Sequence, residues 1–169
     1  MEAQISAGTM HNPRHLWLNI RPNGTETPHA FERLELRICD RIDDPDILLA
    51  ITALYECMIH QIIDSGLDIN DSPLFVGDEN ETALHQLADE NEDAVAQKSL
   101  EAEITDWRTG KRVLTADLIR SRLQDLTETA SALGISEWLT PINRILTTGS
   151  PATRWLARHA AGESIRDII

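Results

Sequence analysis

The feature that most constrains the fold is a long segment whose apolar residues recur at helical spacing. Asp44-Pro45 is a plausible helix cap followed by a first-turn proline, and Ser65-Gly66 offers a place for the helix to end. The apolar positions between them are Ile47, Leu48, Ile51, Leu54, Tyr55, Met58, Ile59 and Ile62. This spacing predicts a helix over residues 45–64, which covers one face of a sheet.

Two segments before this helix alternate in the way that is typical of strands. Leu16, Leu18 and Ile20 share one face of residues 15–21, and a second alternation covers residues 33–40. Pro22-Asn23-Gly24 supplies turn chemistry between the two segments. If the segments pair, they form a short antiparallel sheet with one apolar face and one polar face. The polar face then carries Arg21, Arg33, Glu35 and Arg37.

The rest of the chain is predicted to be mainly helical. Residues 1–13 and 67–82 read as loops, and residues 83–100 read as a second helix. Trp107 to Lys111 predicts a tight turn between two short extended pieces, and a helix from Thr115 should stop at Gly134. Two shorter helices should follow, from Ser136 to Gly149 and from Ser150 to Gly162. The prediction is one α+β domain over residues 1–169, with a partial antiparallel sheet and helix as the larger content.

Composition narrows the classes of function. The net charge is −13, from 15 basic and 28 acidic side chains. The chain therefore lacks the general excess of Lys and Arg that binds a nucleic-acid backbone. No targeting segment is evident at the start, and no run approaches the roughly 18 consecutive apolar residues of a membrane span. We therefore expect a cytoplasmic protein without nucleic-acid or membrane partners.

The segment Leu34 to Asp40 is the one most suggestive of chemistry. Alternation places Glu35 and Arg37 on the same strand face, about 7 Å apart along the strand. A carboxylate there could hold Mg²⁺, and a guanidinium beside it could grip phosphate oxygens with two hydrogen bonds. The alternative is a ladder of salt bridges across a solvated sheet face, and the pattern alone leaves both open.

Longer runs of the sequence resemble a known family. The run FERLELRICDRIDDPDILLAITALYECMIHQII, residues 31–63, is similar to the C-terminal half of bacterial glutamate–cysteine ligases and related carboxylate–amine ligases, especially the cyanobacterial-type branch. The stretch GTMHNPRHLWLNIRPNG, residues 8–24, and the stretch DENEDAVAQKSLEAEITDWRTGKRVL, residues 89–114, resemble the same branch in order and spacing. The resemblance covers nearly the whole chain and implies a fold of the glutamine synthetase-like superfamily.

The resemblance also implies roles for three residues. Glu35 matches a divalent-metal ligand of the catalytic sheet, for Mg²⁺ or Mn²⁺. Arg37 matches a catalytic arginine that binds phosphate or substrate, and Arg21 matches a second cation over the phosphates of ATP. Enzymes of this family phosphorylate a carboxylate with ATP, and an amine then attacks the acyl phosphate. The implied reaction joins glutamate to cysteine, which is the first step of glutathione biosynthesis.

The family's N-terminal half, which supplies further acidic ligands and much of the substrate pocket, has no counterpart here. The isolated chain is therefore expected to carry a partial active site and to be inactive alone. Its expected partners are the missing half, or a second copy paired through an open sheet edge. The alternative is a non-catalytic relative that serves as an interaction or structural domain. Asn91 is interpreted as a helix-start residue, and Trp107, Trp138 and Trp155 as core residues.

Overall fold

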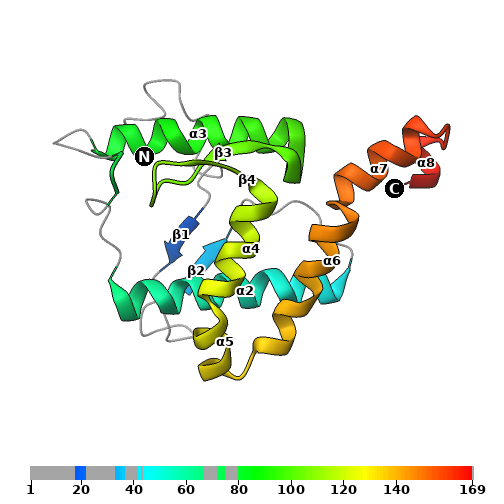
Figure 1. Cartoon of the computed structure of the whole chain (residues 1–169). Helices are drawn as coiled ribbons and strands as arrows, with labels where there is room; N and C mark the ends of the chain where they lie inside the picture. Colours follow the sequence, from blue (N-terminus) through cyan, green and yellow to red (C-terminus); the bar gives the residue numbers. More distant parts are fainter. Residues whose placement is uncertain are drawn as a thin grey trace. The chain divides into compact units, whose positions relative to one another are not determined.

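The computed structural model describes residues 18–21, 33–36, 42, 44–66, 72–74 and 80–168. The chain divides into two compact units, Met1–Asp43 and Asp44–Ile169. Figure 1 follows the chain from β1 to α8. Helix is the dominant content and the sheets are small and antiparallel, which confirms the predicted α+β class.

In the described residues of the first unit, β1 (Leu18–Arg21) pairs with β2 (Arg33–Leu36) as an antiparallel hairpin. Its register aligns Leu18 with Leu36 and Ile20 with Leu34. The predicted pairing of the two alternating segments is therefore confirmed in the described residues. The predicted strand ends at 15–17 and 37–40, and the predicted loop at 1–13, lie outside them.

The second unit is organised around α2 (Pro45–Ser65), which agrees with the predicted helix within one residue. Asp44 caps its start, because the Asp44 carboxylate accepts hydrogen bonds from the backbone N–H groups of Asp46 and Ile47. Pro45 follows as the first helical residue, where its missing N–H costs nothing. Gly66 ends the helix with φ of 66°, a left-handed value that favours glycine.

A long helix and a small hairpin come next in the chain. Helix α3 (Asn80–Lys98) begins three residues before its predicted start, inside the predicted 67–82 loop, and the 3₁₀ turn η3 (Ser99–Glu101) follows it. Strands β3 (Glu103–Thr105) and β4 (Arg112–Leu114) pair around the predicted 107–111 turn, which is confirmed. The turn is closed by Asp106, whose backbone N–H donates to the Lys111 carbonyl at 2.9 Å.

The segment predicted as a single helix from Thr115 to Gly134 is two helices, α4 (Thr115–Asp125) and α5 (Thr127–Leu133). The break falls at Leu126, whose backbone leaves helical geometry at φ −91° and ψ 1° where its side chain becomes fully buried. Gly134 ends α5 in the left-handed region, as the sequence predicts.

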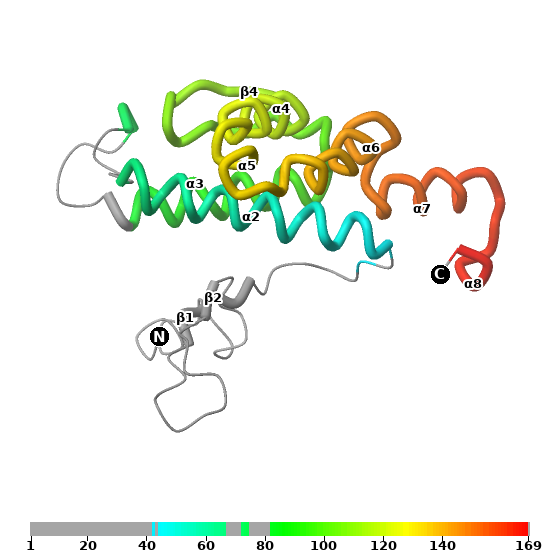
Figure 2. The backbone as a smooth tube through the Cα atoms, turned by 90° about the horizontal axis from the view of Figure 1, so that it is seen from below, coloured from blue at the N-terminus to red at the C-terminus, as the bar shows by residue number. Residues whose placement is uncertain are grey.

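The C-terminal part continues through shorter helices. The 3₁₀ turn η4 (Ser136–Leu139) leads into α6 (Thr140–Thr148), where Pro141 sits in the first turn. Helix α7 (Pro151–Ala160) starts at the Ser150 cap, and α8 (Ile165–Ile168) is a single turn. Both extend away from the core of this unit in two views (Figures 1 and 2). Trp138 of η4 is 46% exposed, so its interpretation as a core residue is wrong.

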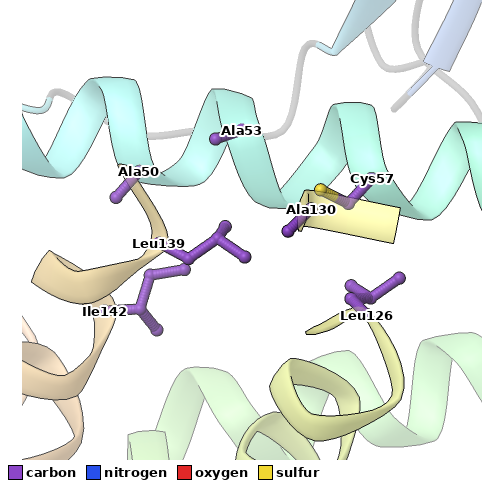
Figure 3. Close-up of a cluster of buried hydrophobic side chains, with 7 residues drawn as sticks. All are labelled: Ala50, Ala53, Cys57, Leu126, Ala130, Leu139 and Ile142. Atoms are coloured by element: carbon purple, nitrogen blue, oxygen red, sulfur yellow. The ribbon is translucent and has the colours of Figure 1, made fainter. Parts of the chain in front are cut away.

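The core of the second unit lies between α2 and the segment from α4 to α6. Figure 3 shows the buried side chains of α2 pointing toward those of α5, η4 and α6. The cluster consists of Ala50, Ala53, Cys57, Leu126, Ala130, Leu139 and Ile142. Small residues on α2 allow close approach of the other helices, and Leu126 fills the space between them.

Helix α2 is also long and apolar enough, by length and composition alone, to cross a membrane. Core helices of soluble proteins pass the same test, and α2 contributes Ile47, Ala50, Ala53 and Cys57 to the buried interior. It is the one such helix among the residues that the structure describes.

Candidate functional site

The β1–β2 hairpin carries two of the three predicted site residues. Its register sets Arg21 directly opposite Arg33 and Glu35 directly opposite Asn19. Because opposite residues of an antiparallel pair share a face, these four positions belong to one face of the hairpin. Arg37, the predicted catalytic and phosphate-binding arginine, lies outside the described residues.

This register bears on the alternative of a salt-bridge ladder. Directly opposite positions have Cβ atoms about 4.5–5.5 Å apart, and like charges placed so are destabilising. The hairpin pairs arginine with arginine and glutamate with asparagine, so neither charged rung is a directly opposed ion pair. Two guanidinium groups at one rung are best accommodated when an anion lies between them, since each can donate several hydrogen bonds to it.

The predicted metal site depends on Glu35 alone. Protein-bound Mg²⁺ is commonly held by one or two carboxylates, with water and substrate phosphate oxygens completing the shell. Glu35 is a residue type of this kind, and the register places it opposite Asn19. Across the described ranges, no group of three or more His, Cys, Asp or Glu side chains could hold a metal ion.

In the second unit, a charged cluster surrounds the 107–111 turn. The Asp106 side chain, 9% exposed, pairs with Arg122 at 2.9 Å and accepts hydrogen bonds from the Thr109 hydroxyl and the Arg108 backbone N–H. Arg122 also contacts Asp125 at 3.2 Å. Burial lowers the pKa of Arg108, and the nearby Arg122 lowers it further. The Asp106 carboxylate is thus engaged in holding the turn, which is a structural role.

Asn91 has a role that the sequence interpretation missed. It lies in the middle of α3, not at its start, and its side-chain amide donates to the Thr105 carbonyl at 2.9 Å. The Thr105 backbone N–H donates to the side-chain oxygen Oδ1 of Asn91 at 2.9 Å. Asn91 therefore pairs with strand β3 as a neighbouring strand would. An asparagine in mid-helix was the available signal, because asparagine is a poor helix former.

A pocket of about 420 Å³ lies among α4, α5, η4 and α6. Its lining mixes apolar and neutral polar side chains with one charged group, Arg120, which pairs with Asp117 at 2.6 Å. The described residues that line it include no carboxylate, histidine or cysteine, so none of them would serve as a general base to activate the serine and threonine hydroxyls there. The lining is Arg120, Leu123, Gln124, Thr127, Ala130, Ser136, Leu139, Thr140 and Asn143.

Comparison with known proteins identifies the relatives of the chain. The model of glutamate–cysteine ligase family 2 matches residues 1–169. The chain is 29% identical over 98% of its length to a "Putative glutamate--cysteine ligase 2" of Gloeobacter violaceus, and 32% identical over 99% of its length to a "Putative glutamate--cysteine ligase 2-1" of Frankia alni. It spans 41% of the length of each of these relatives. No solved structure matches it.

Proposed function

Because the chain belongs to glutamate–cysteine ligase family 2, we propose that it supplies part of the active site of an ATP-dependent ligase that joins glutamate to cysteine. Family membership and the printed names of the relatives support ligase chemistry. The observation that carries the proposal within the fold is the pairing of Arg21 with Arg33 beside Glu35 on one hairpin face.

The proposed reaction has two steps. The γ-carboxylate oxygen of glutamate attacks the γ-phosphorus of ATP, which forms an acyl phosphate and releases ADP. The amine of cysteine then attacks the acyl carbon, which forms the amide, expels inorganic phosphate and releases a proton. Charge accumulates on the transferred phosphoryl oxygens during the first step, and fixed cations stabilise it.

The hairpin residues fit this chemistry as binding groups. In the proposal Arg21 and Arg37 hold phosphate oxygens, and Glu35 is a ligand to Mg²⁺ or Mn²⁺, which would neutralise phosphate charge when bound. Arg33, opposite Arg21, is a further candidate for the same anion. One hairpin cannot surround two amino acids and a nucleotide. The rest of the site is therefore assigned to the part of the family's length that this chain does not span.

The proposal places the protein in the cytoplasm, where ATP and both amino acids are available, without a nucleic-acid or membrane partner. The excess of acidic side chains supports the absence of a nucleic-acid surface. The competing function, a structural or interaction domain without catalysis, makes the opposite forecast for substitutions on the hairpin.

The test is a ligase assay on this chain combined with the remaining segment of the Gloeobacter violaceus or Frankia alni relative. Glu35→Gln keeps the side-chain size but removes the charge that a hard cation requires, so turnover should fall at least ~100-fold with little change in thermal unfolding. Arg37→Lys should also lower turnover, because an ammonium cannot form the two-pronged contact of a guanidinium.

Glu103→Gln is the matched control, since Glu103 lies on strand β3 in an exposed ion pair with Arg112 at 3.8 Å. Its turnover should equal that of the unsubstituted chain. Full turnover in both Glu35→Gln and Arg37→Lys would end the metal and phosphate assignments and favour the structural alternative.

A further inference from the structure

The β1–β2 hairpin places two cations opposite each other at one end. Arg21 is the last residue of β1 and Arg33 is the first residue of β2, and the register pairs them directly. Opposite residues of an antiparallel pair have Cβ atoms about 4.5–5.5 Å apart, and like charges at such positions destabilise the pairing. The charges of this rung therefore oppose the pairing of the two strands.

The neighbouring positions on the same hairpin face compensate only part of this charge. Glu35 is diagonal to Arg21, a relation that sets residues about 7–8 Å apart, and Asn19 opposite Glu35 is neutral. Two arginines against one glutamate leave a net charge of +1 on these four positions, in a chain whose net charge is −13. Paired guanidinium groups without matching carboxylates are typical of a site that an external anion completes.

In the described residues, the sheet of β1 and β2 has two strands of four residues each. Two-stranded hairpins are marginally stable in water, so one electrostatic interaction can decide whether their strands stay paired. The sheet of β3 and β4 also has two strands, and its register pairs Glu103 with Leu114, Ile104 with Val113 and Thr105 with Arg112. None of these three rungs opposes like charges, and so β3–β4 is an internal control.

We propose that Arg21 and Arg33 together bind one phosphoryl group, and that this anion holds β1 and β2 together. The inference rests on the proposed function, which gives the chain a phosphate-bearing substrate, and it makes the pairing of the hairpin depend on that ligand. A phosphoryl group has three acceptor oxygens and up to two negative charges, so it can accept hydrogen bonds from both guanidinium groups. Binding and strand pairing are then coupled, because the anion binds the paired strands and not the separated ones.

Amide hydrogen exchange of the whole chain, with and without inorganic phosphate, tests this coupling. Protection of the β1 and β2 amides should rise about elevenfold at a phosphate concentration of ten times Kd, because a ligand of the paired state multiplies its population by 1 + [L]/Kd. Protection of the β3 and β4 amides should change less than about twofold. Sodium chloride at the same ionic strength is the control. An equal rise in chloride would overturn the proposal, since screening alone would then relieve the repulsion.

Arg33→Gln distinguishes a phosphate-binding residue from a structural one. Without phosphate, protection of β1 and β2 should stay the same or rise, because the opposed charge is gone. The rise on adding phosphate should fall below about threefold, because one guanidinium remains. Arg112→Gln is the matched control, since Arg112 lies opposite Thr105 on the other hairpin, and it should keep the full phosphate effect. A full phosphate effect in Arg33→Gln would overturn the proposal, as would lower protection without phosphate, which would show that Arg33 already pairs with an anion of the chain.

ADP and inorganic phosphate distinguish the two sources of a phosphoryl group. Protection that ADP raises at lower concentrations than phosphate assigns the rung to the nucleotide, and otherwise the rung binds free phosphate, a product of the second step. Either result supports the proposal, and no effect of both ligands overturns it. A phosphate effect in a chain that forms no product with the remaining segment would refute the proposed function alone. Product formation without any phosphate effect, and with full turnover of Arg33→Gln, would refute this inference alone.

Discussion

Asn91 holds the edge of strand β3 with both polar atoms of its side chain, and its two hydrogen bonds to Thr105 are each 2.9 Å long. Asn91→Ala should lower the free energy of unfolding by about 1–3 kcal/mol, because it leaves a part-buried backbone N–H and carbonyl without partners. Urea unfolding monitored by circular dichroism measures this. Gln86→Ala is the control on the same helix. The Gln86 amide donates a hydrogen bond to the exposed Glu90 carboxylate, so a loss equal to that of Asn91→Ala would show that the Asn91–Thr105 hydrogen bonds do not stabilise the fold specially.

Cys57 makes the free energy of unfolding depend on pH under alkaline conditions. Its thiol is fully buried, and burial, aided by Glu56, raises its pKa above the ordinary value of 9.0. The folded state therefore retains the proton after the unfolded chain begins to lose it. The associated stability is complete below pH 9 and is lost as the pH rises through the raised pKa, by at most about 1.4 kcal/mol per pH unit.

Urea unfolding at pH 8, 9 and 10 should show this decline in the unsubstituted chain and a shallower one in Cys57→Ala. The alanine variant is less stable at every pH because it loses packing, and so only the slope against pH is diagnostic. The same slope in both proteins would mean that the Cys57 thiol does not contribute to the decline of stability with pH.

At the scale of the element, Asp44 joins two helices. One carboxylate oxygen caps α2, while the other pairs with Arg144 of α6. Asp44→Ala removes the cap and the pair and should destabilise the second unit by about 1–2 kcal/mol. Asp44→Asn keeps an oxygen for the cap and loses only a half-exposed ion pair, so its cost should be about 0.5 kcal/mol. Thermal unfolding measures the stability that each variant loses. Equal losses in the two variants would contradict the separate contributions of the helix cap and the ion pair.

Elements marked by local chemistry are the ones that sequence reasoning predicted well. Asp44, Pro45 and Gly66 bound α2, and Gly134 ends α5, because capping preferences act within one turn of the helix. Three other features depend on contacts with distant segments: the helix break at Leu126, the hydrogen bonds of Asn91 to Thr105 and the exposure of Trp138. Alternation within one segment carries no information about such contacts.

The candidate site was likewise predictable from the sequence only in part. The alternating pattern predicted the pairing of the two strands, and pairing alone sets Arg21 and Glu35 on one hairpin face. The precise rungs, Arg21 with Arg33 and Asn19 with Glu35, depend on the length of the connection and could not be read from the pattern. The roles of Arg21, Glu35 and Arg37 stay predictions, because Arg37 lies outside the described residues and the register places the other two positions without showing what they bind.

At the scale of the whole molecule, the second unit has one core that several elements share. The buried cluster takes residues from α2, α5, η4 and α6, and Leu126 at the α4–α5 junction is its largest fully buried hydrophobic side chain. A core divided among so many elements cannot lose one of them and keep the rest packed. We therefore expect these helices to unfold in a single transition.

Leu126→Ala should lower the free energy of unfolding of this unit by about 2–5 kcal/mol, since the fully buried site loses apolar contacts and gains a cavity. Leu156→Ala is the matched control, because Leu156 of α7 is 69% exposed and its truncation should change stability by about 0.5 kcal/mol or less. Urea unfolding followed by far-ultraviolet circular dichroism and by tryptophan fluorescence should give coincident curves for both variants, with the midpoint of Leu126→Ala clearly lower. Separate transitions for the two probes in the unsubstituted chain, or equal midpoints for the two variants, would show that the helices do not share one core.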